Sequence, residues 1–204
     1  MPRSPVLLQS PRLRIRHAQP SDIPNIINYY QQNRDYLAPF EPLKTSTFYT
    51  HHYWEKAISQ RLADTQAEKN LKLFLFLKQP TNTLIGSLNF SNFTRGVFQN
   101  CTMGYSLDEC YQGQGYMSEA LQVGIRYIFS HLKFHRIEAN YLPNNQRSGK
   151  LLKRLGFKVN GYAPDYLYIA GQWQDHILTS LINPTTMRTP SQTAAKSVAF
   201  STQT

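Results

Sequence analysis

A glycine-rich turn lies between an expected strand and an expected helix near the middle of the chain, and it constrains the fold more than any other feature. The turn and the start of the helix comprise Gln112, Gly113, Gln114, Gly115, Tyr116 and Met117. Two glycines let backbone N–H groups converge without obstruction by side chains, and the dipole of the following helix adds positive potential there. The turn is therefore suited to binding a pyrophosphate.

The spacing of the glycines excludes two common phosphate-binding motifs. The Walker motif ends in Gly-Lys-Ser or Gly-Lys-Thr, which is absent here, and the dinucleotide fingerprint needs a third glycine and a downstream acidic residue. A glycine turn before a helix is also often only a turn. The turn alone therefore leaves the ligand open.

The hydrophobic periodicity around the turn predicts a mixed α/β (α+β) domain built around one sheet. Before the turn we expect a strand over residues 13–17, helices over 20–34 and 47–68, and strands over 71–77, 83–90 and 101–107. After it we expect a helix with one apolar face, a strand over 136–142, a helix over 146–155 and strands over 166–170 and 174–181. Strands 71–77 and 83–90 form an expected hairpin.

The length of 204 residues suits one domain with one substantial core. We expect an N-terminal arm over residues 1–10, the folded domain over 11–183, and a disordered tail over 184–204, because that last segment is rich in Ser, Thr, Pro and Gln without periodicity. The chain has no apolar run near the roughly 20 residues that cross a bilayer, and its start lacks a signal peptide's pattern. We therefore expect a cytoplasmic protein without a membrane partner.

The cysteines and the charged residues indicate the function less clearly than the glycine turn does. Cys101 and Cys110 show neither a CxxC spacing nor a completing ligand pair, so no metal site is expected. The formal net charge of +10 implies attraction to nucleic acid, ribosomes or a phosphorylated cofactor. The positive residues are scattered, for example Arg12 near the start and Lys150 and Lys153 on a late helix, and a solvated surface explains most of them.

The glycine turn and a second motif that follows it in the sequence resemble the signature of the GCN5-related N-acetyltransferase (GNAT) superfamily. The superfamily signature Gln/Arg-x-x-Gly-x-Gly/Ala is similar to the turn, where Gln112, Gly113 and Gly115 match and Met117 departs. The second half of the signature resembles Asn144-Asn145-Gln146-Arg147-Ser148 followed by Leu155-Gly156-Phe157. The resemblance implies a central mixed, mostly antiparallel sheet flanked by helices, and acetyl-CoA as the donor.

A narrower resemblance points to the RimJ-like branch, the ribosomal-protein-alanine N-acetyltransferases. It rests on Met117, on Ser148, and on the runs Gly161 to Tyr166 and Phe40-Glu41-Pro42, and it extends over residues 11–181. It implies that the acceptor is the N-terminal alanine or serine of a ribosomal protein. The positive net charge favours an RNA-rich target such as the ribosome over a cationic small amine.

The resemblance also implies roles for residues around the turn. Tyr105, Ser106 and Leu107 occupy the strand end that pairs with pantetheine in this superfamily, although they could equally be the end of a buried strand. Many members carry a tyrosine that protonates the leaving sulfur, and here that position is Leu152. Ser148, one helical turn earlier, is the replacement that the resemblance implies, with Asn145 holding the cofactor or simply capping the helix.

For the general base, the resemblance implies Asp165, expected in a loop before the last hairpin, with Glu41 as the competing candidate. Both could instead be exposed surface carboxylates. An unperturbed α-amine has a pKa of about 7.7 to 8.0, so either acid needs only to orient an amine that is already partly neutral.

Two other functions remain open at this point. A small-molecule amine acetyltransferase would share the sheet and the cofactor site and differ in its acceptor loops. A non-catalytic ribosome- or RNA-binding module would explain the net charge of +10, but aromatic residues are not visibly interleaved with basic ones in the sequence.

Overall fold

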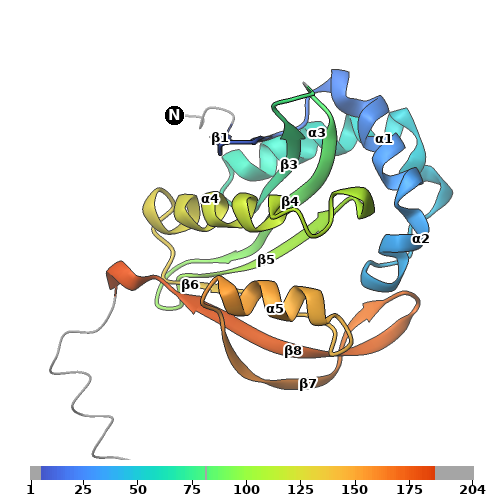
Figure 1. The fold of residues 1–204 in the computed structure, drawn as a ribbon. Helices are drawn as coiled ribbons and strands as arrows, with labels where there is room; N and C mark the ends of the chain where they lie inside the picture. Colours follow the sequence, from blue (N-terminus) through green and yellow to red (C-terminus); the bar gives the residue numbers. More distant parts are fainter. Residues whose placement is uncertain (1–5, 81, 187–204) are drawn as a thin grey trace, which may run out of the picture.

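The computed structural model of the chain describes residues 6–80 and 82–186, in which eight strands form one sheet in the order β1-β2-β3-β4-β5-β6-β8-β7 (Figure 1). The strands are β1 (Leu7–Gln9), β2 (Leu13–Arg16), β3 (Leu71–Leu77), β4 (Leu84–Thr94), β5 (Asn100–Leu107), β6 (Arg136–Glu138), β7 (Lys158–Ile169) and β8 (Gln172–Ile182). The α-helices are α1 (Ile23–Gln32), α2 (Arg34–Leu37), α3 (His51–Gln66), α4 (Tyr116–Ser130) and α5 (Gln146–Arg154).

Neighbouring strands run antiparallel except for β5 and β6, which pair in parallel. The expected mixed, mostly antiparallel sheet is therefore confirmed. The single parallel pair requires a crossover, and α4 supplies it between β5 and β6.

Helices cover both faces of the sheet, because the central strand β3 is apolar on both sides. Leu71, Leu73 and Leu75 pack in the cluster that contains α4, whereas Phe74 and Phe76 pack in the cluster that contains α1 and α3. In Figure 1, α4 and α5 lie in front of the sheet and α3 lies behind it.

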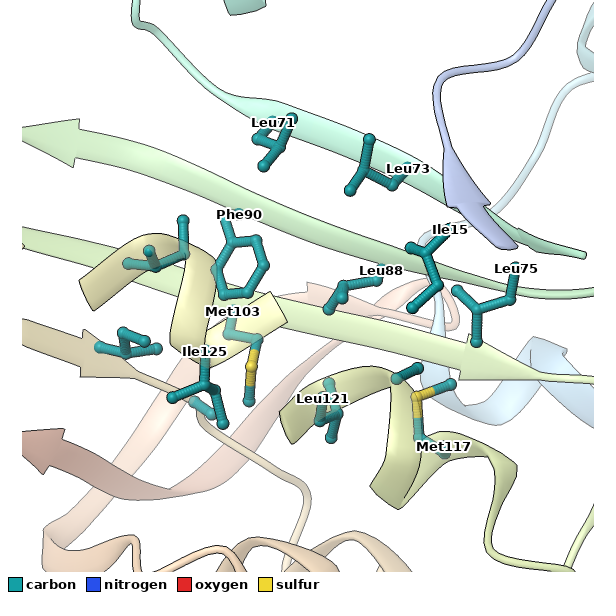
Figure 2. Close-up of a cluster of buried hydrophobic side chains, with 14 of the residues drawn as sticks. Ile15, Leu71, Leu73, Leu75, Leu88, Phe90, Met103, Met117, Leu121 and Ile125 are labelled. Atoms are coloured by element: carbon teal, nitrogen blue, oxygen red, sulfur yellow. The ribbon is translucent and has the colours of Figure 1, made fainter. Parts of the chain in front are cut away.

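The apolar face of α4 docks closely on the sheet, as the sequence periodicity predicts. Met117, Leu121 and Ile125 point toward strand residues that include Leu88 and Met103 (Figure 2). Gly124 of the same helix permits this approach, since a Cβ there would lie 2.6 Å from a methyl carbon of Leu88. These contacts hold α4, and with it the glycine turn at its start, against the strands β4 and β5.

Several expected boundaries differ from those in the structure. Part of the predicted N-terminal arm forms β1, which pairs with β2 at the sheet edge. The strand expected over residues 136–142 ends at Glu138, where its pairing with β5 stops, although Ala139 still donates to the carbonyl of Thr179 on β8 at 3.1 Å. The strand expected from residue 166 begins at Lys158, and its mostly exposed residues give little apolar signal.

The C-terminal tail falls mostly outside the described residues, which end with a short 3₁₀ turn, Pro184–Thr186. Within the described part of the chain, no helix is long and apolar enough to span a bilayer.

Candidate active site

The glycine turn joins the end of β5 to the start of α4, as predicted. Gly113 and Gly115 adopt φ of 73° and 83°, a region that side chains disfavour. The side chain of Gln112 donates to the carbonyl of Leu107 at 3.2 Å, and that of Gln114 donates to the carbonyl of Cys110 at 3.0 Å. These bonds tie the turn to the strand end.

The first amides of α4 are available to an anion. Gly115 is the N-cap, and no side chain caps the amides of α4 among the described residues. A Cβ built on Gly113 would meet nothing within 4 Å, so the surface of the turn is open. A 15-residue helix beginning in this way is well suited to hold phosphate oxygens, so the residues fit a pyrophosphate-bearing ligand.

Arg12, just before β2, supports the turn from the side, which the sequence does not reveal. Its Nε donates to Glu119 Oε2 at 2.7 Å, its Nη1 donates to the carbonyl of Gln114 at 3.0 Å, and its guanidinium lies 4.1 Å from the ring centroid of Tyr116. These partners lie more than a hundred positions away along the chain, so local patterns carry no signal for the contact.

The strands β5 and β6 diverge beside the turn. Their pairing ends at Thr102 and Glu138, and Tyr141 then forms a bridge with Ile177 of β8. From Met103 to Leu107, β5 is paired with β4 on one side, while no strand of the described chain pairs with its other side. This open backbone edge can accept an extended ligand as an added strand.

Tyr105 and Ser148 meet beside this open edge. Tyr105 Oη lies 2.7 Å from Ser148 Oγ, and either can be the donor. Asn145 caps α5 by accepting from the amide of Ser148 at 3.1 Å. Burial raises the pKa of Tyr105 to about 12, so its hydroxyl stays protonated at neutral pH. The structure therefore joins three of the predicted residues in one hydrogen-bonded group.

Ser106 points to the opposite face of the sheet from Tyr105. Its Oγ accepts from Tyr29 Oη at 2.9 Å and lies 2.9 Å from Ser87 Oγ. Burial raises the pKa of Tyr29, so this hydroxyl also stays protonated. Just beyond, Asn33 donates to Asp108 Oδ2 at 2.8 Å. These bonds attach the end of β5 to α1. The side chain of Ser106 therefore has a structural role, while its backbone remains at the open edge of β5.

The two predicted acids are not hydrogen-bonded to this group in the described chain. Glu41 forms an ion pair with Lys44, and its carbonyl accepts from the amide of Ala170 at 3.1 Å. Asp165 lies inside β7, not in the expected loop, at a bulge where its φ is 46°. No hydrogen bond in the described residues connects either acid to Ser148, whose side-chain partner is Tyr105.

Asp175, a residue that the sequence analysis missed, joins Asp165 on the last hairpin. Its Oδ1 accepts from the amide of Asp165 at 2.9 Å, and its Oδ2 accepts from the hydroxyl of Tyr162. The hydrogen bond from Tyr162 is the largest cause that lowers the pKa of Asp175, so this carboxylate stays ionised. The carboxylate of Asp175 therefore lies against the backbone of Asp165 on an exposed hairpin.

The described residues contain no group of three or more His, Cys, Asp or Glu side chains that could hold a metal ion. Cys101 is buried and Cys110 is exposed, and both thiols are free.

Comparison with known proteins assigns this arrangement to a class. Residues 12–158 match the acetyltransferase (GNAT) domain family, and the chain therefore belongs to this family of N-acetyltransferases. The predicted superfamily, fold and enzyme class are confirmed.

The most informative relatives are ribosomal-protein acetyltransferases. Escherichia coli (strain K12) ribosomal protein uS5-alanine N-acetyltransferase is 40% identical over 179 residues, which cover 88% of this chain and 92% of that protein. The solved structure of the ribosomal-protein-S5-alanine acetyltransferase from Vibrio fischeri is 38% identical, with a TM-score of 0.83 over 90% of this chain and all of that one. The predicted resemblance to this branch is confirmed.

A more distant structure was solved with a cofactor. Mycobacterium smegmatis RimJ, in complex with CoA-disulfide, shares 23% identity and a TM-score of 0.81 over 97% of this chain and 95% of that one. At this identity the similarity shows the fold alone.

Proposed function

We propose that this chain transfers the acetyl group of acetyl-CoA to the N-terminal alanine or serine of a ribosomal protein in the cytoplasm. The observation that supports this acceptor is the 40% sequence identity, over 88% of the chain, to an enzyme named for the alanine of ribosomal protein uS5. The catalytic unit is the domain of residues 11–183 together with β1, which pairs with β2.

The proposed donor site runs from the glycine turn along β5 to α5. Amides of the turn and of the first residues of α4 would hold the pyrophosphate, with Gln112, Gln114 and Arg12 keeping the turn in shape. The open edge of β5 at Tyr105 to Leu107 would pair with the pantetheine arm. Asn145 would support the site by fixing the start of α5.

The transfer forms one N–C bond and breaks one C–S bond, while the amine loses a proton and the sulfur gains one. Acetyl-CoA supplies the activated acyl group. Ser148 would donate a proton or hydrogen bond to the sulfur, and Tyr105, protonated because of its raised pKa, would donate in turn to Ser148.

For the acceptor amine, the last hairpin is the better supported of the two acidic positions. The carboxylate of Glu41 is already paired with the ammonium of Lys44. Asp165 and Asp175, by contrast, lie on the same hairpin, where the amide of Asp165 donates to the carboxylate of Asp175, and neither takes part in an ion pair among the described residues. Their negative charge would attract an α-ammonium group and orient it as it loses its proton.

Purified ribosomal proteins and small-molecule amines, incubated with isotopically labelled acetyl-CoA, test this assignment. We expect label on the N-terminal peptide of one ribosomal protein, detected by mass spectrometry, and much less label with the Ser148→Ala variant. Label only on small amines would favour a small-molecule acetyltransferase, and binding to ribosomes without any label would favour a non-catalytic module.

A further inference from the structure

A cluster of positive charge lies on α5 and the start of β7. Residues 139–164 contain five Lys or Arg residues and no Asp or Glu, in a chain whose net charge is +10. The five are Arg147, Lys150, Lys153, Arg154 and Lys158. About an eighth of the chain thus carries half of its net positive charge.

All five side chains are exposed, and none has an acidic partner within the described chain. That part of the chain contains all 12 of its Asp and Glu residues, and none of the ion pairs there involves any of the five. On α5, Arg147, Lys150 and Arg154 are spaced three and four residues apart and so share one face of the helix. None of these acids pairs with the five basic side chains to offset the repulsion between them.

A groove with a volume of about 630 Å³ lies between α5 and the strands β7 and β8, and we call it the basic groove. Lys150, Lys153 and Lys158 are its only charged lining residues in the described chain. The buried side chains of Leu152 and Phe157 also line it, as does the ring of Tyr141. Cationic and aromatic groups from different elements therefore meet here.

The lysines of the basic groove face away from the proposed acetyl-transfer site, although Tyr141 at the groove lies near enough to Tyr105 to help raise its pKa. Ser148 and Lys150 are two positions apart on α5, so their side chains point about 160° away from each other around the helix axis. Ser148 bonds to Tyr105 of β5, whereas Lys150 lines the groove toward β7 and β8. The two sites thus occupy opposite sides of α5.

We propose that the basic groove and the exposed face of α5 form a binding surface for single-stranded RNA. Lysines at the groove and the outward Arg147 and Arg154 would contact successive phosphates, while an unstacked base would lie against Tyr141 and the apolar lining. A polyanion with a flat apolar group between its charges matches this combination better than an acidic protein surface, which offers charge without such a group. This property is independent of acetyl transfer.

The test compares two triple variants that remove the same charge. The groove variant is Lys150→Gln, Lys153→Gln and Lys158→Gln, and the control variant is Lys56→Gln, Lys69→Gln and Lys133→Gln, which changes exposed lysines elsewhere. The full-length proteins are titrated with a fluorescent single-stranded RNA of mixed sequence at several salt concentrations. Thermal unfolding, acetyl-CoA affinity and acetylation of a short alanine-initial peptide are measured in parallel.

We expect the groove variant to bind RNA on the order of ten- to a hundredfold more weakly than the control variant. The slope of log K against log salt should fall by about 2, since each lost single-strand phosphate contact contributes about 0.7.

Equal RNA affinity in the two variants would overturn the proposal. A matching loss of acetyl-CoA affinity would assign the groove to the donor site instead, and equally strong competition by polyglutamate would assign it to an acidic protein. Failure of peptide acetylation in every protein, with RNA binding intact, would count against the proposed acceptor and not against this surface.

Discussion

Ser148 and Tyr105 share one hydrogen bond of 2.7 Å, so the effects of substituting them are coupled. We expect Ser148→Ala to lower kcat on the order of ten- to a thousandfold with little change in acetyl-CoA affinity, because a donor to the leaving sulfur acts mainly in the transition state. Tyr105→Phe should cost less, and the double variant should be little worse than Ser148→Ala alone. Steady-state kinetics and calorimetry measure both quantities. Additive losses would show that the two hydroxyls act separately.

The raised pKa of Tyr105 predicts the shape of the pH profile. The rate with a peptide should rise as its α-amine loses a proton near pH 8. Burial raises the pKa of Tyr105 to about 12, so the hydroxyl remains a donor above the pH of about 10 at which an ordinary tyrosine ionises. We therefore expect kcat/KM to reach a plateau and hold it to about pH 10, in assays limited to pH values at which the enzyme stays folded. A decline centred near pH 10 would contradict a protected tyrosine.

At the scale of elements, the glycine turn and α4 form the part of the proposed site on which we expect donor binding to depend most. Gly115 has a φ of 83°, and a Cβ there would lie 3.4 Å from Arg12 Nη2. Gly115→Val should therefore distort the turn and lower acetyl-CoA affinity by at least tenfold, as measured by calorimetry. Gly161→Val is the matched control, because Gly161 has neither a positive φ nor a neighbour within 4 Å of its Cβ position. Equal affinities in a folded Gly115 variant would place the pyrophosphate elsewhere.

Elements with a strong apolar pattern are the ones that the sequence predicts well. The residues of β3 alternate between two cores, and the apolar face of α4 packs on the sheet. The period of the apolar residues in these two elements therefore indicates which side chains are buried. In contrast, β7 is an edge strand with mostly exposed residues, and it includes Pro164, which an edge strand tolerates. Its pattern therefore resembles a loop, which explains why the sequence predicts Asp165 in one.

At the scale of the whole molecule, the candidate site combines local and distant signals. The glycine turn, Asn145 and Ser148 could be predicted because each lies in a contiguous motif. The support from Arg12, the pairing of Tyr105 with Ser148 and the meeting of Asp165 with Asp175 join different elements. Tertiary packing creates these contacts, so no single stretch of sequence contains them.

Among the described residues, both hydrophobic clusters lie between Val6 and Leu181, and the composition of residues 187–204 predicts the effect of shortening the chain. Removing residues 187–204 should change the melting temperature by no more than a few degrees and leave kcat/KM within about twofold, because this Ser-, Thr- and Gln-containing segment offers few apolar groups to bury. Asn183 should be kept, since its side chain donates to the carbonyl of Phe134 at 3.1 Å. Thermal unfolding and the peptide assay on both lengths test this expectation. A large drop in melting temperature would show that the segment packs on the domain.

In the proposed reaction the acceptor preference depends on the whole molecule, because the donor site on β5 and the last hairpin would have to act on the same amine. At neutral pH an α-amine with a pKa near 8 offers roughly a few hundredfold more neutral form than a lysine with a pKa near 10.4. A site whose acids only orient the amine should therefore prefer the N-terminus. We expect peptides beginning with Ala or Ser to be acetylated at least tenfold faster, in kcat/KM, than the same peptide with a blocked N-terminus and an internal lysine, and faster than aminoglycosides. Asp175→Asn should reduce this preference while leaving acetyl-CoA affinity unchanged, and thiol release measures each rate. Faster turnover of the lysine peptide or an aminoglycoside would contradict the N-terminal acceptor and leave the family assignment intact.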